Sequence, residues 1–324
     1  MSSKLRTPDQ FRLWGSGSFA HICFESPGCR FRKAGYCVMC DYGAGSMLSP
    51  EQAVTAIQSA TANWGKPIKR LLLGTCGSIF DEREMLPETL STIVCEIEKT
   101  EIESIIFETH YSFVTEELLR KLATSLPCKK IAIELGFESS NPVVLEKSLH
   151  KYMNLGDLSE AISLIRSFNM SSILNVFLGA PGLTTAQQLE DSIRSVHWAF
   201  AHGADEVVIF PANIKPGTTL WRDWESGRYE LPSSWLLVEL LRHLPKEELE
   251  TTSISWYGDR QRNGVDTDIL APACCERCRD TLFTFYYSFM ENFRADIRTR
   301  LISDLIETSV CSCHEELIKR LKEG

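Results

Sequence analysis

The stretch ESPGCRFRKAGYCVMCDYG, residues 25–43, decides how this chain is interpreted. It follows a short apolar stretch and carries Cys29, Cys37 and Cys40 in the spacing C-x7-C-x2-C. Thiolates are soft ligands that select zinc or iron–sulfur clusters. A set of three thiolates leaves one metal position open, and an open position indicates chemistry rather than a purely structural site.

A zinc knuckle is the alternative interpretation of these three cysteines. Its fourth ligand would come from His21, Cys23 or another residue. Because Cys23 lies inside the preceding apolar stretch, where a cysteine usually packs as a small apolar side chain, we leave it out of the cluster.

The chain around this stretch alternates short β-branched segments with amphipathic segments of helical length. Ser49, Thr115 and Thr184 provide helix start signals, each followed by acidic or amide residues. This alternation predicts an α/β fold, a partial (β/α)6 barrel in which active-site residues lie at the carboxyl ends of the strands. The predicted strands are residues 19–24, 68–73, 104–107, 130–135, 172–178 and 206–210.

The predicted domain organisation has three parts. Residues 1–18 form an N-terminal lead-in, residues 19–215 form the partial barrel, and residues 216–324 form a small, mostly helical extension that bears cysteines. Within the extension we expect a loop over residues 251–273 and one or two helices over residues 282–321.

Composition limits the classes of function. The 324 residues are 44% hydrophobic and carry a formal net charge of −9, which disfavours a large nucleic-acid footprint. No apolar run approaches the ~20 residues of a membrane helix, and the first residues lack the apolar core of an export signal. We therefore expect a cytoplasmic protein without a membrane span, whose cysteines are reduced.

Polar residues follow several of the predicted strands. The turn GTCGSIFD, residues 74–81, contains glycines that permit close approach of a ligand to the backbone. Carboxylates at strand ends can bind ribose hydroxyls or an amino group, although capping and solvated rim charges are the competing interpretation. The candidate ligand-binding residues are Gly77, Ser78, Glu108, Glu138, Lys151 and Asn175.

Taken together, these segments resemble the radical S-adenosylmethionine (SAM) superfamily. The resemblance is to its branch with an elongator-acetyltransferase-type radical domain, and to the radical SAM subunits of archaeosine synthase and their relatives. The matching segments are residues 27–43, 77–81 and 136–139, and the late cysteine pairs C-x2-C and C-x-C.

The resemblance implies a [4Fe–4S] cluster on Cys29, Cys37 and Cys40, with SAM bound near Gly77, Ser78, Glu138 and Lys151. SAM would be cleaved reductively to a 5′-deoxyadenosyl radical, which abstracts a substrate hydrogen and starts C–N or C–C bond cleavage or rearrangement. Flavodoxin or ferredoxin would donate the electron.

The substrate prediction has two branches. The resemblance implies a lyase-like step on a tRNA nucleoside, cleavage of a C–N bond in a lysine adduct of a modified deazaguanine. A small-molecule or natural-product substrate is the other branch. His110 and Tyr111 are the candidate catalytic residues, and Asn213 is a candidate for the substrate side.

A second group of cysteines lies near the carboxyl end. Cys275, Cys278, Cys311 and Cys313 form two short-spaced pairs that fit a zinc site or an auxiliary iron–sulfur cluster. His314 is an alternative ligand. If both cysteine groups bound zinc, the chain would instead be a non-catalytic zinc-binding module.

Overall fold

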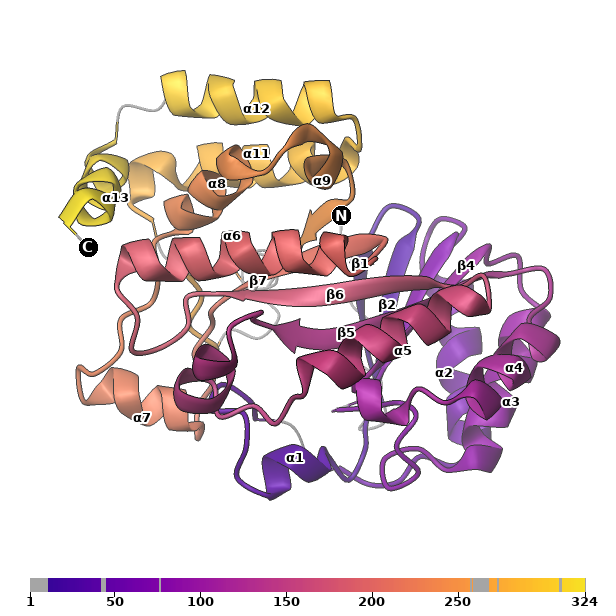
Figure 1. Ribbon diagram of the computed structural model, residues 1–324. Coiled ribbons are helices and arrows are strands. Elements are labelled where there is room, and N and C mark those ends of the chain that lie inside the picture. Colours follow the sequence, from indigo (N-terminus) through magenta and orange to yellow (C-terminus); the bar gives the residue numbers. More distant parts are fainter. Residues whose placement is uncertain are drawn as a thin grey trace. The chain divides into compact units, whose positions relative to one another are not determined.

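The structure is a computed structural model that describes residues 11–41, 45–75, 77–256, 258, 268–272, 274–308 and 311–323 (Figure 1). Tyr42, Gly43 and Cys76, which belong to the sequence motifs, lie outside the described residues. The chain divides into two compact units. The first comprises residues 1–36, 42–136 and 154–173, and the second comprises residues 37–41, 137–153 and 174–324.

Five strands lie wholly or mainly in the first unit. They are β1 (Phe11–Ser16), β2 (Phe19–Phe24), β3 (Arg70–Gly74), β4 (Ser104–Thr109) and β5 (Lys130–Glu138). β1 and β2 form an antiparallel hairpin, whereas β2 to β5 pair in parallel and in chain order. Their central residues are almost all buried and apolar, as expected for parallel strands covered on both faces.

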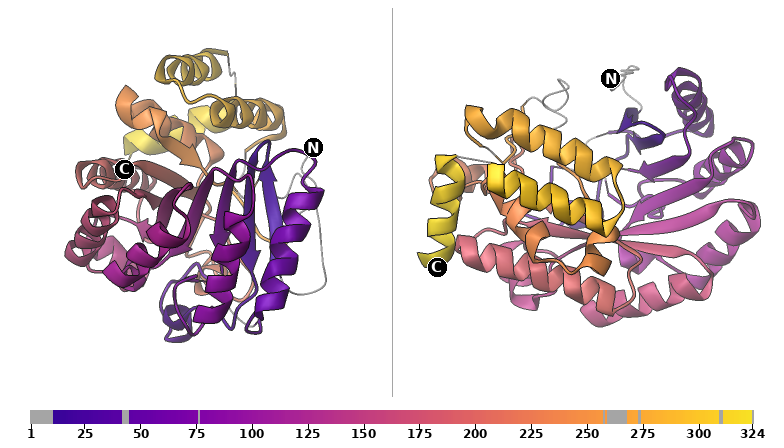
Figure 2. Two further views of the ribbon diagram at one scale, coloured as in Figure 1. Left: turned by 90° about the vertical axis from the view of Figure 1, so that its right-hand side faces the viewer. Right: turned by 90° about the horizontal axis from the view of Figure 1, so that it is seen from above.

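The helices of the first unit begin at the predicted caps. Ser49 forms a capping box with Gln52, and the Thr115 hydroxyl accepts a hydrogen bond from the Leu118 amide. Helices α2, α3 and α4 lie side by side on one face of the strands (Figure 2). The elements are α1 (Arg30–Lys33), α2 (Pro50–Asn63), α3 (Pro87–Glu98), η1 (Tyr111–Phe113), α4 (Glu116–Ser125) and α5 (Leu155–Ser167).

The second unit contains most of β6 (Ser171–Leu178), together with β7 (Glu206–Pro211) and β8 (Thr252–Ile254), which pair in parallel with each other. Its short helices are η2 (Val144–Ser148), α7 (Thr219–Glu225) and α9 (Lys246–Glu250). Its longer helices are α6 (Thr185–Ala201), α8 (Ser234–His243), α11 (Glu276–Glu291), α12 (Ala295–Thr308) and α13 (Ser312–Glu323). Residues 234–241 of α8 are all buried, and α8 packs against α6, α12 and α13.

All six predicted strands are present as β2 to β7, and two further strands were missed. β1 lies in the predicted lead-in, where Phe11 and Leu13 alternate as buried residues and Gly17 turns the hairpin with a φ of 59°. β8 lies in the predicted loop and has three residues, too few for a periodic signal.

The carboxyl-terminal segment forms three helices, so the prediction of one or two is wrong. The buried guanidinium of Arg298 donates hydrogen bonds to the carbonyls of Phe289, Leu249 and Thr252, at 3.3, 2.5 and 2.7 Å. The bond to Phe289 satisfies a carbonyl in the last turn of α11, and the bonds to Leu249 and Thr252 tie the beginning of α12 to α9 and β8. Within the described part of the chain, no helix is both long and apolar enough to cross a membrane.

Candidate cofactor site

Cys29 lies in the first unit, where it is the residue before the first turn of α1. Its side chain makes no capping hydrogen bond, and its carbonyl accepts a hydrogen bond from the Lys33 amide at 3.1 Å. The adjacent Arg30 donates from Nε to Asp81 Oδ2 at 2.6 Å, in a two-pronged ion pair. Asp81 raises the pKa of Arg30 through this hydrogen bond. The cysteine-bearing turn is therefore tied to the loop after β3.

The carboxylate of Glu84 holds the loop after β3 by hydrogen bonds. Its side chain is fully buried and accepts hydrogen bonds from the Ser26 and Thr75 hydroxyls and from the Ser78 amide, at 3.1, 3.0 and 3.1 Å. Burial raises the pKa of Glu84, while these three donors oppose the shift. One carboxylate thus joins the end of β2 to the turn after β3.

Two glycines keep space open at these strand ends. A Cβ atom on Gly77 would lie 2.3 Å from Glu84 Oε1 and 2.8 Å from the Cβ of Cys29. A Cβ atom on Gly74 would lie 2.7 Å from Glu108 Oε2. Only glycine fits at either position without a shift of its neighbours, so the turn brings bare backbone next to Cys29 and Glu108.

His110 follows β4 and is packed by aromatic rings. Its ring centroid lies 4.3 Å from that of Phe31 and 4.4 Å from that of Tyr111, and its Nδ1 lies 2.8 Å from the Ser112 hydroxyl. The Tyr111 hydroxyl accepts a hydrogen bond from the Asn154 amide at 3.0 Å. Both predicted catalytic residues are buried, and both are engaged in contacts that fix their side chains.

Cys37 and Cys40 lie in the second unit, on a short loop. The Cys37 amide donates to the His150 carbonyl at 2.8 Å, and the Cys40 amide donates to the Cys37 carbonyl at 3.0 Å. Beyond Cys40, Lys215 Nζ lies 2.9 Å from Asp41 Oδ1. The loop is held at both ends by residues of its own unit.

Three residues of the second unit have a strained backbone. Cys37, Glu138 and His150 adopt left-handed φ values of 60°, 67° and 49°. In the described chain the only other non-glycine residue in this conformation is Asn169, at the end of α5. A left-handed backbone costs a residue with a Cβ roughly 1–2 kcal/mol and concentrates at functional sites. Two of the three strained positions are predicted site residues.

Glu138 ends β5 and pairs with a predicted partner. Lys151 Nζ lies 2.5 Å from Glu138 Oε2, and the two side chains are only 10% and 17% exposed. The next residue, Ser139, is buried and donates to the Asp191 carboxylate of α6 at 2.9 and 3.0 Å. Burial raises the pKa of Asp191 to about 6. The strained turn is thus anchored to α6.

Two asparagines of the second unit carry unsatisfied acceptors. Asn175 on β6 and Asn213 after β7 are buried, and the side-chain Oδ1 of each has no hydrogen-bond partner among the described residues. Buried amide oxygens are nearly always paired in folded proteins. Each is therefore suited to accept a hydrogen bond from a bound molecule.

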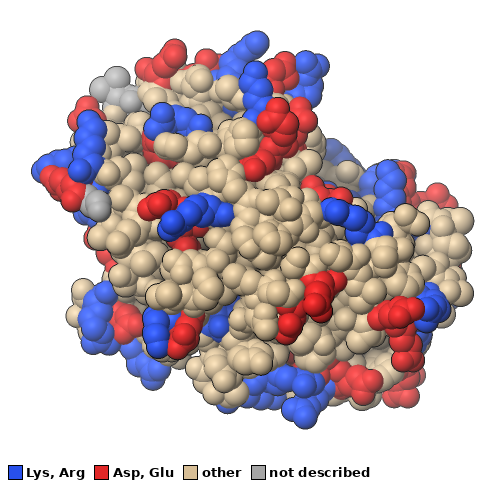
Figure 3. All heavy atoms as spheres, in the orientation of Figure 1, with Lys and Arg blue, Asp and Glu red and all other residues tan. Residues whose placement is uncertain are grey.

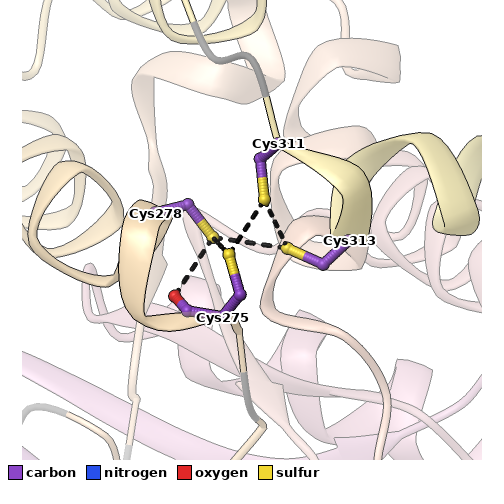
Figure 4. Close-up of side chains that lie close together, drawn as sticks. All are labelled: Cys275, Cys278, Cys311 and Cys313. Atoms are coloured by element: carbon purple, nitrogen blue, oxygen red, sulfur yellow. Dashed lines mark hydrogen bonds between the residues drawn. The ribbon is translucent and has the colours of Figure 1, made fainter.

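The late cysteines converge within the second unit. The Sγ atoms of Cys275, Cys278, Cys311 and Cys313 all lie within 4.8 Å of one another (Figure 4). His314 instead points its Nε2 at Glu239 Oε1, 3.2 Å away, and stacks on Trp235. The structure therefore brings together the four predicted sulfurs and leaves out the alternative histidine.

Sequence reasoning missed Glu84 and Asp191. Glu84 lies in a loop among other charged residues, and nothing in its neighbourhood distinguishes it from a solvated carboxylate. The sequence around Asp191 does contain a pattern that could have indicated its burial. Gln188, Ser192 and Ser195 lie on the same buried face of α6 at helical spacing, so this face has a stripe of polar residues where an apolar stripe is expected.

No protein-family model matches the sequence. The chain is 28% identical over 308 residues to archaeosine synthase subunit beta of Methanosarcina acetivorans, covering 93% of this chain and 84% of that protein. It is 27% identical over 305 residues to the protein of the same name from Thermococcus kodakarensis, covering 88% and 90%. The sequence similarity thus extends over nearly the full length of these relatives.

Two solved structures share the fold. Elp3 of Methanocaldococcus infernus superposes with a TM-score of 0.51 at 15% identity over 84% of this chain, and methylornithine synthase superposes with 0.53 at 15% over 71%. This chain spans 63% and 61% of those proteins, less than two thirds of either. The predicted α/β partial-barrel fold is confirmed.

Proposed function

We propose that the chain is a radical SAM enzyme, which uses a [4Fe–4S] cluster and SAM to modify a nucleoside of tRNA. Cys29, Cys37 and Cys40 are the proposed cluster ligands. When bound, the cluster and SAM supply a 5′-deoxyadenosyl radical that removes a hydrogen atom from the substrate.

The observation that carries the proposal is the missing side chain at Gly77. Any Cβ there would meet Cys29 at 2.8 Å, so bare backbone lies directly beside a thiol of the three-cysteine set. The donors suit the group: thiolates bind iron–sulfur clusters, and three of them leave one iron open for SAM.

The surrounding residues have positioning and binding roles in this proposal. The Arg30–Asp81 pair and the buried Glu84 hold the turn that carries Cys29. Glu138 and Lys151 form a largely buried pair of opposite charges, which suits the amino and carboxylate groups of SAM. Glu108 and the unsatisfied oxygen of Asn175 are proposed to accept hydrogen bonds from SAM.

The resemblance to archaeosine synthase subunit beta supports a tRNA-borne substrate and a partner subunit. We propose that the step cleaves a C–N bond in an adduct on a modified base, with His110 and Tyr111 near the substrate. An electron donor of the flavodoxin or ferredoxin type completes the system.

A small-molecule substrate is the second candidate, favoured by the charge of the chain. The net charge is −9, and acidic and basic side chains are interspersed on the face drawn in Figure 3. A protein that binds tRNA by itself usually presents an area of positive charge. If tRNA is the substrate, a basic partner subunit would supply part of the footprint.

Anaerobic reconstitution tests the proposal. The chain is incubated with SAM, a strong reductant and either tRNA bearing the modified base or the corresponding free nucleoside, and 5′-deoxyadenosine is measured. We expect product from the wild type that increases with tRNA, and none from Cys37→Ala. Cys128→Ala, which alters an exposed cysteine outside both groups, should behave as the wild type.

Two results would change the conclusion. Stimulation by the free nucleoside but not by tRNA would favour the small-molecule branch. No 5′-deoxyadenosine from a wild-type chain that has bound no iron would refute the radical mechanism.

A further inference from the structure

The four late cysteines come from the beginnings of two helices. Cys275 caps α11 and Cys278 lies in its first turn, while Cys311 and Cys313 lie at the beginning of α13. The Sγ–Sγ distances are 3.5 Å for 275–278, 3.1 Å for 275–311, 3.3 Å for 278–313 and 2.9 Å for 311–313. Figure 4 shows the four sulfurs directed at one common centre.

These distances fit one metal ion. The shortest, 2.9 Å, is well beyond the ~2.05 Å of a disulfide bond. Four thiolates at about 2.3 Å from a zinc ion in a tetrahedron lie about 3.8 Å from one another. All four sulfurs here lie within 4.8 Å. A four-iron cluster binds each thiolate through a different iron and needs the sulfurs farther apart.

We propose that Cys275, Cys278, Cys311 and Cys313 form a closed, tetrahedral zinc site that is structural. Four protein ligands leave no open position for a substrate or SAM. Cys278 and Cys311 are buried, so water has little access to the centre. This site is independent of the proposed cluster at Cys29, Cys37 and Cys40.

The proposed site joins α11 to α13, a helix that buries few side chains. Within α13 only Leu317 is buried, although the helix spans twelve residues. Burial of one leucine does not offset the conformational entropy of ordering such a helix. The other contacts of α13 are its packing against α6 and α8, the stacking of His314 on Trp235, and the ion pairs of His314 with the buried Glu239 and of Arg320 with Glu230 at 3.1 Å. The metal supplies the missing constraint by joining α13 to α11.

Metal analysis of the full chain tests the zinc assignment. The variant Cys29→Ala, Cys37→Ala, Cys40→Ala removes the proposed cluster ligands, so any remaining metal belongs to the second site. We expect a colourless protein with one zinc ion per chain. Replacement of zinc by Co²⁺ should give the visible absorption of tetrahedral cobalt thiolate. A brown protein with several irons, a single iron in place of zinc, or no metal at all would overturn the proposal.

Single variants test the ligand set and the role. Cys278→Ser and Cys313→Ser should lose the zinc ion, whereas Cys274→Ser, which changes the neighbouring cysteine outside the group, should retain it. Hydrogen exchange after chelation should speed up by at least tenfold over residues 312–323 and stay unchanged in β2 to β4. Zinc loss in Cys274→Ser, or unchanged exchange in α13 after zinc removal, would contradict the assigned site and its structural role.

Discussion

The two cysteine groups of this chain differ in what surrounds their sulfurs. The late group brings four thiols together within one unit, at the beginnings of α11 and α13. The early group has three cysteines: Cys29 lies in the first unit near an ion pair, a buried carboxylate and a bare glycine, and Cys37 and Cys40 lie in the second unit, where Cys37 itself has a left-handed backbone. A closed set of ligands needs only packing around it, whereas an open set needs residues that position and bind a second molecule.

Substituting one cysteine in each group should have the largest effect. Cys40→Ala should remove the iron and lower 5′-deoxyadenosine formation by about 1000-fold or more, because an incomplete ligand set cannot retain the cluster. Zinc should remain at one ion per chain. Cys278→Ser should do the reverse, with zinc lost and iron retained. Iron and zinc analysis beside the activity assay checks both variants.

If either substitution removed both metals, the two sites would not be independent, and the contrast between them would fail. Cys128→Ala controls for the loss of a thiol as such, since that cysteine is exposed and lies outside both groups.

Filling the space beside Cys29 should have the next largest effect. In Gly77→Ala the new methyl group would meet Glu84 at 2.3 Å and Cys29 at 2.8 Å. Overpacking of this kind costs roughly 1–3 kcal/mol, so we expect a loss of about 2 kcal/mol in the free energy of unfolding. Activity should fall as well, by up to about 100-fold, because a shift of Cys29 and of the turn beside it misplaces the reacting groups. Urea denaturation and the 5′-deoxyadenosine assay measure the two effects.

Gly156→Ala is the matched control. Gly156 lies in the first turn of α5, where the nearest atom to a new Cβ is Asn154 Oδ1 at 3.2 Å. The helical gain of alanine over glycine, about 1 kcal/mol at most, should leave stability equal or slightly higher. An equal loss in both variants would show that Gly77 has no special role.

Neutralising Glu138 should have a moderate effect. Glu138→Gln removes the charge opposite Lys151 while keeping the shape of the side chain, and it should weaken SAM binding about tenfold, or about 1.4 kcal/mol. Equilibrium dialysis of the reconstituted protein measures the dissociation constant. Glu146→Gln, which breaks an exposed pair with Lys147, should leave it unchanged. Unaltered SAM binding in Glu138→Gln would remove Glu138 from the site.

The cysteines of both groups were easier to identify from the sequence than the residues that surround them. Short cysteine spacings are distinctive, so Cys275, Cys278, Cys311 and Cys313 could be grouped by spacing alone, and the structure places their sulfurs within 4.8 Å of one another. The six strands were predictable for a similar reason, since buried parallel strands read as continuous apolar runs.

The residues that position the early group could not be predicted. Glu84 acquires its role from the burial of its loop, which depends on packing between segments distant in sequence. The left-handed backbone of Cys37 and Glu138 has no sequence signature either, because glycine or asparagine would be expected there. Strained and buried polar positions are where local rules fail and functional sites are found.

The last prediction concerns Asp191, which accepts the hydrogen bond from Ser139 next to Glu138. Burial raises the pKa of Asp191 from 3.8 to about 6, so between these pH values the folded chain holds a proton that the unfolded chain has released. The contribution of this group therefore stabilises the fold at low pH and is lost as the pH rises through that window, by about 1 kcal/mol per pH unit. Asp191→Asn should remove this slope while its side-chain oxygen still accepts from Ser139. Urea denaturation of both proteins from pH 4.5 to 7 measures the difference. Parallel pH profiles would show that Asp191 titrates normally, and the turn at Glu138 would then be anchored by a charged rather than a protonated carboxyl group.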